Sequence, residues 1–144
     1  TEDWEISITP PSNPAYADTD FPIFRYADAI LMRAEAAYRT GDLATAVADV
    51  NMIRERAFGN SSGNITACQL DDKFLLDERG REFYYEGQRR TDLIRFSEFT
   101  GGGYTWAWKG GVYNGTQTSN HLNVYPIPSE EVAANPNIVQ NPGY

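Results

Sequence analysis

Three carboxylates recur at intervals of four residues in the most highly charged stretch of the chain, at Glu78, Glu82 and Glu86. Residues four apart share one face of an α-helix, so a helix here would align the three side chains. Two carboxylates that flank a glycosidic bond are the usual machinery of sugar hydrolysis. Such catalytic carboxylates normally face each other across a cleft, whereas these three stand on consecutive turns of one helix. Their spacing therefore favours ion pairs over catalysis.

Arginine supplies nearly all of the positive charge in the chain. Ten of the twelve basic residues are arginine, and several of them lie close to the three carboxylates in sequence. The planar guanidinium group binds carboxylates through two parallel hydrogen bonds and suits partly buried pairs. We therefore predict a lattice of ion pairs that ties the third and fourth helices to their neighbours. The charged residues within reach of the carboxylates are Arg79, Arg81, Arg89, Arg90, Asp92 and Arg95.

The other reactive side chains form no recognised catalytic or metal-binding pattern. His121 is the only histidine and has no partner visible in the sequence. Cys68 is the only cysteine, so it forms no disulfide within the chain, and we expect it to be a small buried residue. Asp18 and Asp20 lack the regularly spaced oxygen ligands of a calcium loop. The sequence has neither a GxSxG motif nor a phosphate loop, and we expect no bound metal or cofactor.

The aromatic residues between positions 100 and 123 are better candidates for ligand binding. Trp106 and Trp108 alternate around Ala107, so an extended backbone would point both rings in one direction. Flat aromatic rings stack on the apolar C–H faces of sugars with little loss of rotamer entropy. The alternative is that these rings pack the loop onto the helices, since large aromatic residues are often core residues. The predicted ligand-binding residues are Tyr104, Trp106, Trp108 and Tyr113.

The overall composition is that of a globular domain. Of its 144 residues 41% are hydrophobic and 22% charged, and no apolar run approaches the roughly 18 residues of a transmembrane helix. With 12 basic and 20 acidic side chains the net charge is −8, a poor match for nucleic acid or an anionic membrane surface. The chain begins with Thr1 and contains no signal peptide, which indicates a mature or truncated piece of a longer protein.

Proline and glycine locate the helices. All eight prolines lie in 1–22 or 126–144, so long helices are expected between them. The first starts near Ile23 and ends at Arg39, and the following Gly41 suits the left-handed position that terminates a helix. Asp42 caps a second helix that ends at Gly59. The short connection predicts an antiparallel hairpin over 23–58. On the first helix the apolar face comprises Tyr26, Ile30, Ala34, Ala37 and Tyr38, with Asp28, Arg33, Glu35 and Arg39 largely elsewhere.

A second helical pair is predicted over 70–99. Its first helix begins at a cap, Asp71 or Asp72, and runs to about Glu86, with Tyr84 among its apolar positions. Gly87 interrupts it, and a shorter helix follows as far as Phe99. We expect 1–22 to be an extended lead-in and 100–144 to be an aromatic loop followed by a C-terminal strap. The predicted fold is thus mainly α: tetratricopeptide-like helical hairpins in one region, 1–144, wrapped by extended, loop-rich terminal segments.

Four blocks of the sequence carry a more specific likeness. In order they read FPIFRYADAILMRAEAAYRTGDLATAVADVNMIRERA, ERGREFYYEGQRRTDLIRF, TWAWKGG and YPIPSEEVAANPNIVQNPGY. Together they cover nearly the whole chain, and they resemble the C-terminal region of the SusD/RagB family, the surface glycan-binding lipoproteins of Bacteroidetes. The blocks are helix and tail motifs, so the resemblance by itself carries over no ligand-binding residue.

The resemblance implies a non-catalytic protein of nutrient uptake. Its expected ligand is an oligosaccharide, and its expected partner is a TonB-dependent, SusC-like transporter in the outer membrane. It implies a surface-exposed location reached only through a lipid anchor absent from this chain, because Cys68 is internal and is not a lipidation site. Two alternatives stay open: a peptide-binding member of the same family, and a helical-repeat module that docks on a partner protein.

Overall fold

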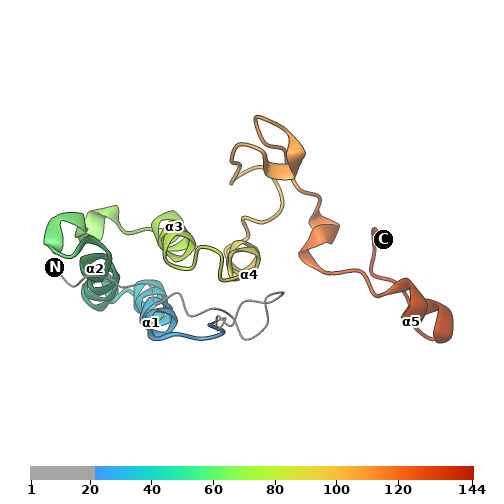
Figure 1. Cartoon of the computed structure of the whole chain (residues 1–144), viewed down its shortest axis with the longest axis horizontal. Helices are drawn as coiled ribbons and strands as arrows, with labels where there is room; N and C mark the ends of the chain where they lie inside the picture. Colours follow the sequence, from blue (N-terminus) through green and yellow to red (C-terminus); the bar gives the residue numbers. More distant parts are fainter. Residues whose placement is uncertain (1–21) are drawn as a thin grey trace, which may run out of the picture.

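The computed structural model describes residues 22–144 and is mainly helical (Figure 1). Within these residues the backbone forms no β-strand, only an isolated bridge between Gly101 and Thr118. None of the described helices is long and apolar enough to cross a membrane. Nearly all of the predicted lead-in, 1–22, lies outside the described residues. The helices are α1 (Tyr26–Thr40), α2 (Leu43–Phe58), α3 (Asp72–Glu82), α4 (Arg89–Arg95) and α5 (Ser129–Ala134), with short 3-10 turns between them.

The turn between α1 and α2 has the predicted chemistry. Gly41 adopts a left-handed conformation with φ 87°, and its N–H donates to the carbonyl groups of Ala37 and Tyr38. The Asp42 side chain accepts a hydrogen bond from the Thr45 backbone N–H at 3.1 Å and so caps α2. Gly59, with φ 70°, ends that helix. Local signals in the sequence are therefore sufficient to define this helical hairpin.

The core lies where α1 packs between α2 and α3. Of the predicted apolar face of α1, Ile30, Ala34 and Ala37 are buried, but Tyr26 is exposed. Because α1 has neighbours on two sides, its buried surface turns to include Ala27 and Leu31, and Tyr26 in the first turn is left outside. Fully or almost fully buried side chains from the three helices include Leu31, Ala34, Ala46, Val50, Ile53 and Leu75.

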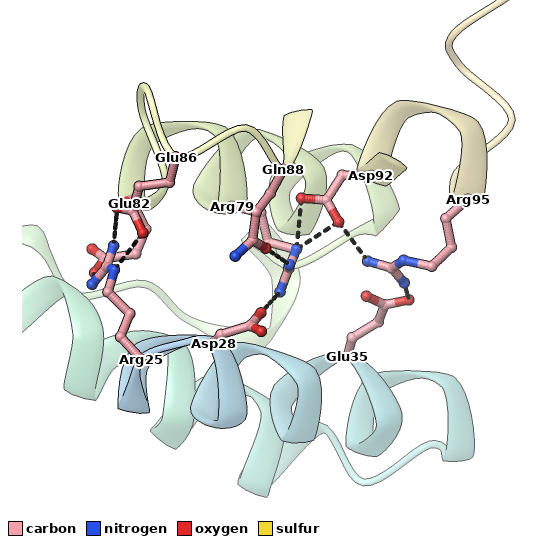
Figure 2. Close-up of polar contacts among 9 residues, drawn as sticks. All are labelled: Arg25, Asp28, Glu35, Arg79, Glu82, Glu86, Gln88, Asp92 and Arg95. Carbon is pink, nitrogen blue, oxygen red and sulfur yellow. Dashed lines mark hydrogen bonds and ion pairs between the residues drawn. The ribbon is translucent and has the colours of Figure 1, made fainter. Parts of the chain in front are cut away.

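The second buried face of α1 carries charge, contrary to the prediction that Asp28 and Glu35 lie elsewhere than on a buried surface. Asp28 forms an ion pair with Arg79 of α3 at 2.9 Å, and Arg79 Nε donates to Asp92 of α4 at 2.8 Å. Glu35 pairs with Arg95 of α4. Figure 2 shows these groups in a row between α1 and the helices above it. Ion pairing reduces the free-energy cost of burying these carboxylates. A prediction based on hydrophobic periodicity does not take such pairing into account and therefore places charged residues on the surface.

One helix start, two helix ends and the predicted burial of Cys68 were also wrong. The first helix begins at Tyr26 and not near Ile23. The third helix ends at Glu82 and not near Glu86. The fourth ends at Arg95 and not at Phe99, because Ser97 adopts a left-handed backbone conformation with φ 61° that an α-helix does not accommodate. Cys68 is exposed rather than buried, in a 3-10 turn between α2 and α3.

The C-terminal third leads away from the helices. Figure 1 shows residues 100–144 running from α4 toward α5 without passing over α1, α2 or α3. The predicted wrapping by this segment is therefore wrong for this chain. Within this segment, Ser129–Ala134 form the short helix α5.

Candidate functional site

The turn after α3 presents two tyrosines to solvent. Tyr84 is 74% exposed and Tyr85 is 85% exposed, and their rings meet edge to face with centroids 4.6 Å apart. Tyr85 has φ 65° and Gly87 has φ 78°, so the backbone reverses here instead of extending α3. A left-handed conformation is costly for an aromatic residue and persists only where surrounding contacts maintain it.

Arg25 supplies such contacts from the start of α1 (Figure 2). Its Nε donates to one carboxylate oxygen of Glu86 at 2.7 Å, its Nη2 donates to the other at 2.8 Å, and its Nη1 donates to Glu82 at 2.5 Å. Its guanidinium carbon also lies 4.7 Å from the centroid of the Phe83 ring. The residues on both sides of the two tyrosines are thus bound to a side chain from another helix.

Glu78, the first of the three spaced carboxylates, is buried and likewise paired with arginine. It accepts hydrogen bonds from Arg54 at 2.8 Å and from Arg81 at 2.5 Å. Because the other two carboxylates bind Arg25, the predicted lattice of ion pairs is confirmed. This arrangement gives all three carboxylates a structural role.

Tyr104 joins the aromatic loop to the helices. Its hydroxyl group donates to Asp77 of α3 and accepts a hydrogen bond from Nη2 of Arg89 at 2.6 Å. Burial of the ring and the hydrogen bond to Asp77 raise the pKa of Tyr104, against the opposing charge of Arg89. The hydroxyl group is therefore protonated at neutral pH and able to donate as described.

Lys109 organises the loop from inside. It is only 4% exposed, and its Nζ donates to the Tyr104 carbonyl group at 2.6 Å. The same ammonium group lies 4.8 Å from the centroid of the Trp106 ring, a cation–π contact. Trp106 in turn meets the Tyr104 ring edge to face, with centroids 5.8 Å apart. These contacts hold Trp106 in a defined orientation while leaving it 43% exposed.

Trp108 and Tyr113 form a separate exposed pair. Their rings meet edge to face with centroids 5.7 Å apart. The predicted extended backbone around Ala107 is wrong, because Trp108 has φ 68° and begins a 3-10 turn. The expected alignment of Trp106 and Trp108 therefore has no basis in the backbone, and each ring has its own partner.

An aromatic cleft lies between the turn after α3 and the aromatic loop. It encloses about 550 Å³, within the range of ligand pockets in proteins. Two of the predicted ligand-binding residues, Tyr104 and Trp106, line it, whereas Trp108 and Tyr113 do not. The full lining is Gly80, Phe83, Tyr84, Tyr85, Gly87, Arg89, Tyr104 and Trp106.

The sequence-based prediction missed the contribution of Tyr84, Tyr85 and Arg89 to this cleft. Two tyrosines placed shortly before Gly87 were a signal that the helix could end there and expose them. Nothing in the sequence marked Tyr85 itself as left-handed. Among residues 22–144, no three His, Cys, Asp or Glu side chains gather in a way that could hold a metal ion, and Asp18 and Asp20 lie outside the described part.

Comparison with solved structures places this arrangement in a known fold. A putative sugar-binding protein from Bacteroides vulgatus superposes with a TM-score of 0.67 at 35% identity, over 86% of this chain and 29% of the other. A SusD superfamily protein from Bacteroides fragilis superposes with a TM-score of 0.61 at 27% identity, over 87% of this chain and 28% of the other.

The sequence comparisons agree with the structural ones. The starch-binding protein SusD of Bacteroides thetaiotaomicron is 47% identical over 135 residues, which are 94% of this chain and 23% of that protein. The SusD-like protein P38 of Formosa agariphila is 37% identical over 91 residues, 58% of this chain and 18% of that protein. The chain thus spans less than a quarter of the length of either relative. The profile of the SusD family matches residues 10–144, and the chain belongs to the SusD family.

Proposed function

We propose that the protein containing this chain binds oligosaccharides at the cell surface without cleaving them and delivers them to a TonB-dependent transporter in the outer membrane. One observation carries the proposal: 94% of the chain is 47% identical to a protein named for binding starch. Starch oligosaccharides are therefore the first ligands to test. Membership of the SusD family supports the non-catalytic role, the surface location and the transporter partner as parts of the same proposal.

The ligand-binding residues that we propose within this chain are the four aromatic residues of the loop together with the two exposed tyrosines. Tyr104 and Trp106 from the loop and Tyr84 and Tyr85 from the turn after α3 line the aromatic cleft, and such rings are suited to stacking on a sugar ring. Trp108 and Tyr113 offer a second exposed platform. The arginine partners of Glu78, Glu82 and Glu86 support binding without hydrolysis.

Calorimetric titration of the full-length protein with maltoheptaose tests the proposal. Loss of a stacking ring removes roughly 1 kcal/mol of contact energy, so we expect Trp106→Ala to weaken binding about fivefold. A smaller loss is expected for Trp108→Ala, whose ring lies outside the cleft. Tyr26→Ala is the control, since Tyr26 is an exposed aromatic residue on α1 that does not line the cleft, and it should bind as the wild type does.

Two further measurements test the remaining parts of the proposal. Chromatography of the oligosaccharide after prolonged incubation should show no shortened product, and a product that disappears with Glu78→Gln would contradict the non-catalytic role. Detergent-solubilised outer membranes should yield a TonB-dependent transporter on affinity purification of the protein.

Unchanged binding in both tryptophan variants would exclude the loop as the ligand site. No binding of any glycan would contradict the proposed function.

A further inference from the structure

Gly80 stands in the interior of α3, where glycine is expensive. A glycine inside a helix costs about 1 kcal/mol relative to alanine. Its backbone is ordinarily helical, so conformation does not demand a glycine there. A Cβ atom at this position would lie 2.8 Å from Nη1 and 3.0 Å from the guanidinium carbon of Arg89. Gly80 therefore leaves room for the Arg89 guanidinium group against the side of α3.

Arg89 reaches this position from the first residue of α4. Its Nη1 donates to the Leu76 carbonyl group at 2.6 Å, and its Nη2 donates to the Tyr104 hydroxyl group at 2.6 Å. These two bonds fix the plane of the guanidinium group. They use two of its five N–H donors, and the side chain remains 36% exposed beside the cleft. The unused donors are thus held in a defined orientation.

The charge of Arg89 is largely balanced where it stands. Asp77 Oδ1 lies 3.7 Å from Arg89 Nη2 and accepts the hydrogen bond of the same Tyr104 hydroxyl group. Among the described residues that line the cleft, Arg89 is the only one with a charged side chain, and the others are aromatic residues and glycines. The cleft therefore combines apolar ring faces with one fixed set of donors and little net charge. This combination suits a neutral, hydroxyl-rich ligand better than an anion.

We propose that Arg89 is the specificity-determining residue of the aromatic cleft, binding neighbouring hydroxyl groups of a neutral sugar whose apolar face stacks on the surrounding rings. The fork of the guanidinium group presents parallel donors, as two adjacent hydroxyl oxygens require. A glycine is required at position 80 because a side chain there would occupy the space of the Arg89 guanidinium group. The inference rests on the proposed function and adds to it a residue and a ligand class.

Two substitutions in the full-length protein, titrated with maltoheptaose, test the inference. Arg89→Lys keeps the positive charge but loses the fork, and we expect binding to weaken roughly ten- to a hundredfold. Gly80→Ala leaves Arg89 in the sequence but displaces its flexible guanidinium group. The higher helix propensity of alanine offsets the loss of the Arg89 hydrogen bonds, so this variant should bind roughly tenfold more weakly while its thermal unfolding midpoint stays close to that of the wild type. Arg56→Lys, at an exposed arginine paired with Glu82, is the control and should bind normally.

The outcomes separate this inference from the function on which it rests. Wild-type affinity in both Arg89→Lys and Gly80→Ala, with weakened binding in Trp106→Ala, overturns the role of Arg89 and leaves glycan binding standing. Tighter binding of an oligosaccharide containing glucuronic acid than of maltoheptaose overturns the neutral ligand class. Failure of the wild-type protein to bind any glycan overturns the proposed function and the inference together.

Discussion

At the scale of single residues, Glu35 shows how arginine makes a buried acid acceptable. Its side chain is almost fully buried on α1, where it accepts hydrogen bonds from Arg39 at 2.8 Å and from Arg95. Burial by itself raises the pKa of Glu35, but the hydrogen bonds and charges of the two arginines outweigh it, and the net pKa lies below the ordinary value. At a pH between the two pKa values, the Glu35 carboxyl group is therefore ionised in the folded state but protonated in the unfolded chain.

The pH dependence of stability follows from this shift. Because the pKa of Glu35 is lower in the folded state, the ion pairs contribute their full stability above about pH 5 and lose it as the pH falls through the folded-state pKa. We expect Glu35→Gln to be less stable than the wild type at pH 7 and to differ from it less at pH 3. Urea unfolding across this range is the measurement, and parallel pH profiles for the two proteins would contradict the assignment.

At the scale of elements, α2 and α3 each begin at a residue whose role is local. The Asp42 side chain caps α2 and the Asp71 side chain caps α3, where it accepts a hydrogen bond from the Phe74 backbone N–H at 2.6 Å. Such caps satisfy backbone N–H groups that have no partner within the helix. Their effect is therefore confined to the first turn and does not depend on the rest of the protein.

Amide hydrogen exchange can test this locality. Asp42→Ala should accelerate exchange in the first turn of α2 by roughly fivefold, the usual effect of a lost cap, and leave α3 unchanged. Asp71→Ala should do the reverse, so each variant is the control for the other. Equal acceleration in both helices by either substitution would show that the caps act through global stability instead.

At the scale of the whole molecule, two adjacent arginines of α4 attach the C-terminal third. Arg89 binds the aromatic loop through Tyr104, as described above. Arg90 donates to the Leu122 carbonyl group at 2.7 Å, and its guanidinium carbon lies 4.0 Å from the centroid of the Tyr125 ring. Since Figure 1 shows the rest of the segment leading away from the helices, these polar contacts carry much of the attachment.

Arg90→Ala is expected to loosen this attachment selectively. Loss of a hydrogen bond from a charged donor together with a cation–π contact should accelerate amide exchange in residues 119–135 about tenfold, with α1 and α2 unaffected. Hydrogen exchange with mass spectrometry on the full-length protein measures both regions at once. Arg56→Ala, which removes an exposed arginine that pairs with Glu82, is the control. Unchanged exchange in 119–135 would show that other contacts hold the segment.

Several features of this protein could be predicted from the sequence because they depend on neighbours in the chain. Gly41 and Asp42 define the helical hairpin through backbone conformation and capping, and the structure confirms both. The abundance of arginine near spaced carboxylates predicted ion pairs, and these are also confirmed. The family resemblance, drawn from four ordered blocks, agrees with the match of the SusD family over residues 10–144.

Other features were decided only by the tertiary structure. The end of α3 and the exposure of Tyr84 and Tyr85 depend on Arg25, which is 61 positions away from Glu86 in the chain. Trp106 and Trp108 lack the predicted common orientation because the backbone of Trp108 is left-handed, a conformation that the alternation of residue types does not predict. Residues far apart in sequence meet in the cleft and in the buried ion pairs. Local propensity ranks the conformations open to a short segment, but here contacts between distant segments determine which one is adopted.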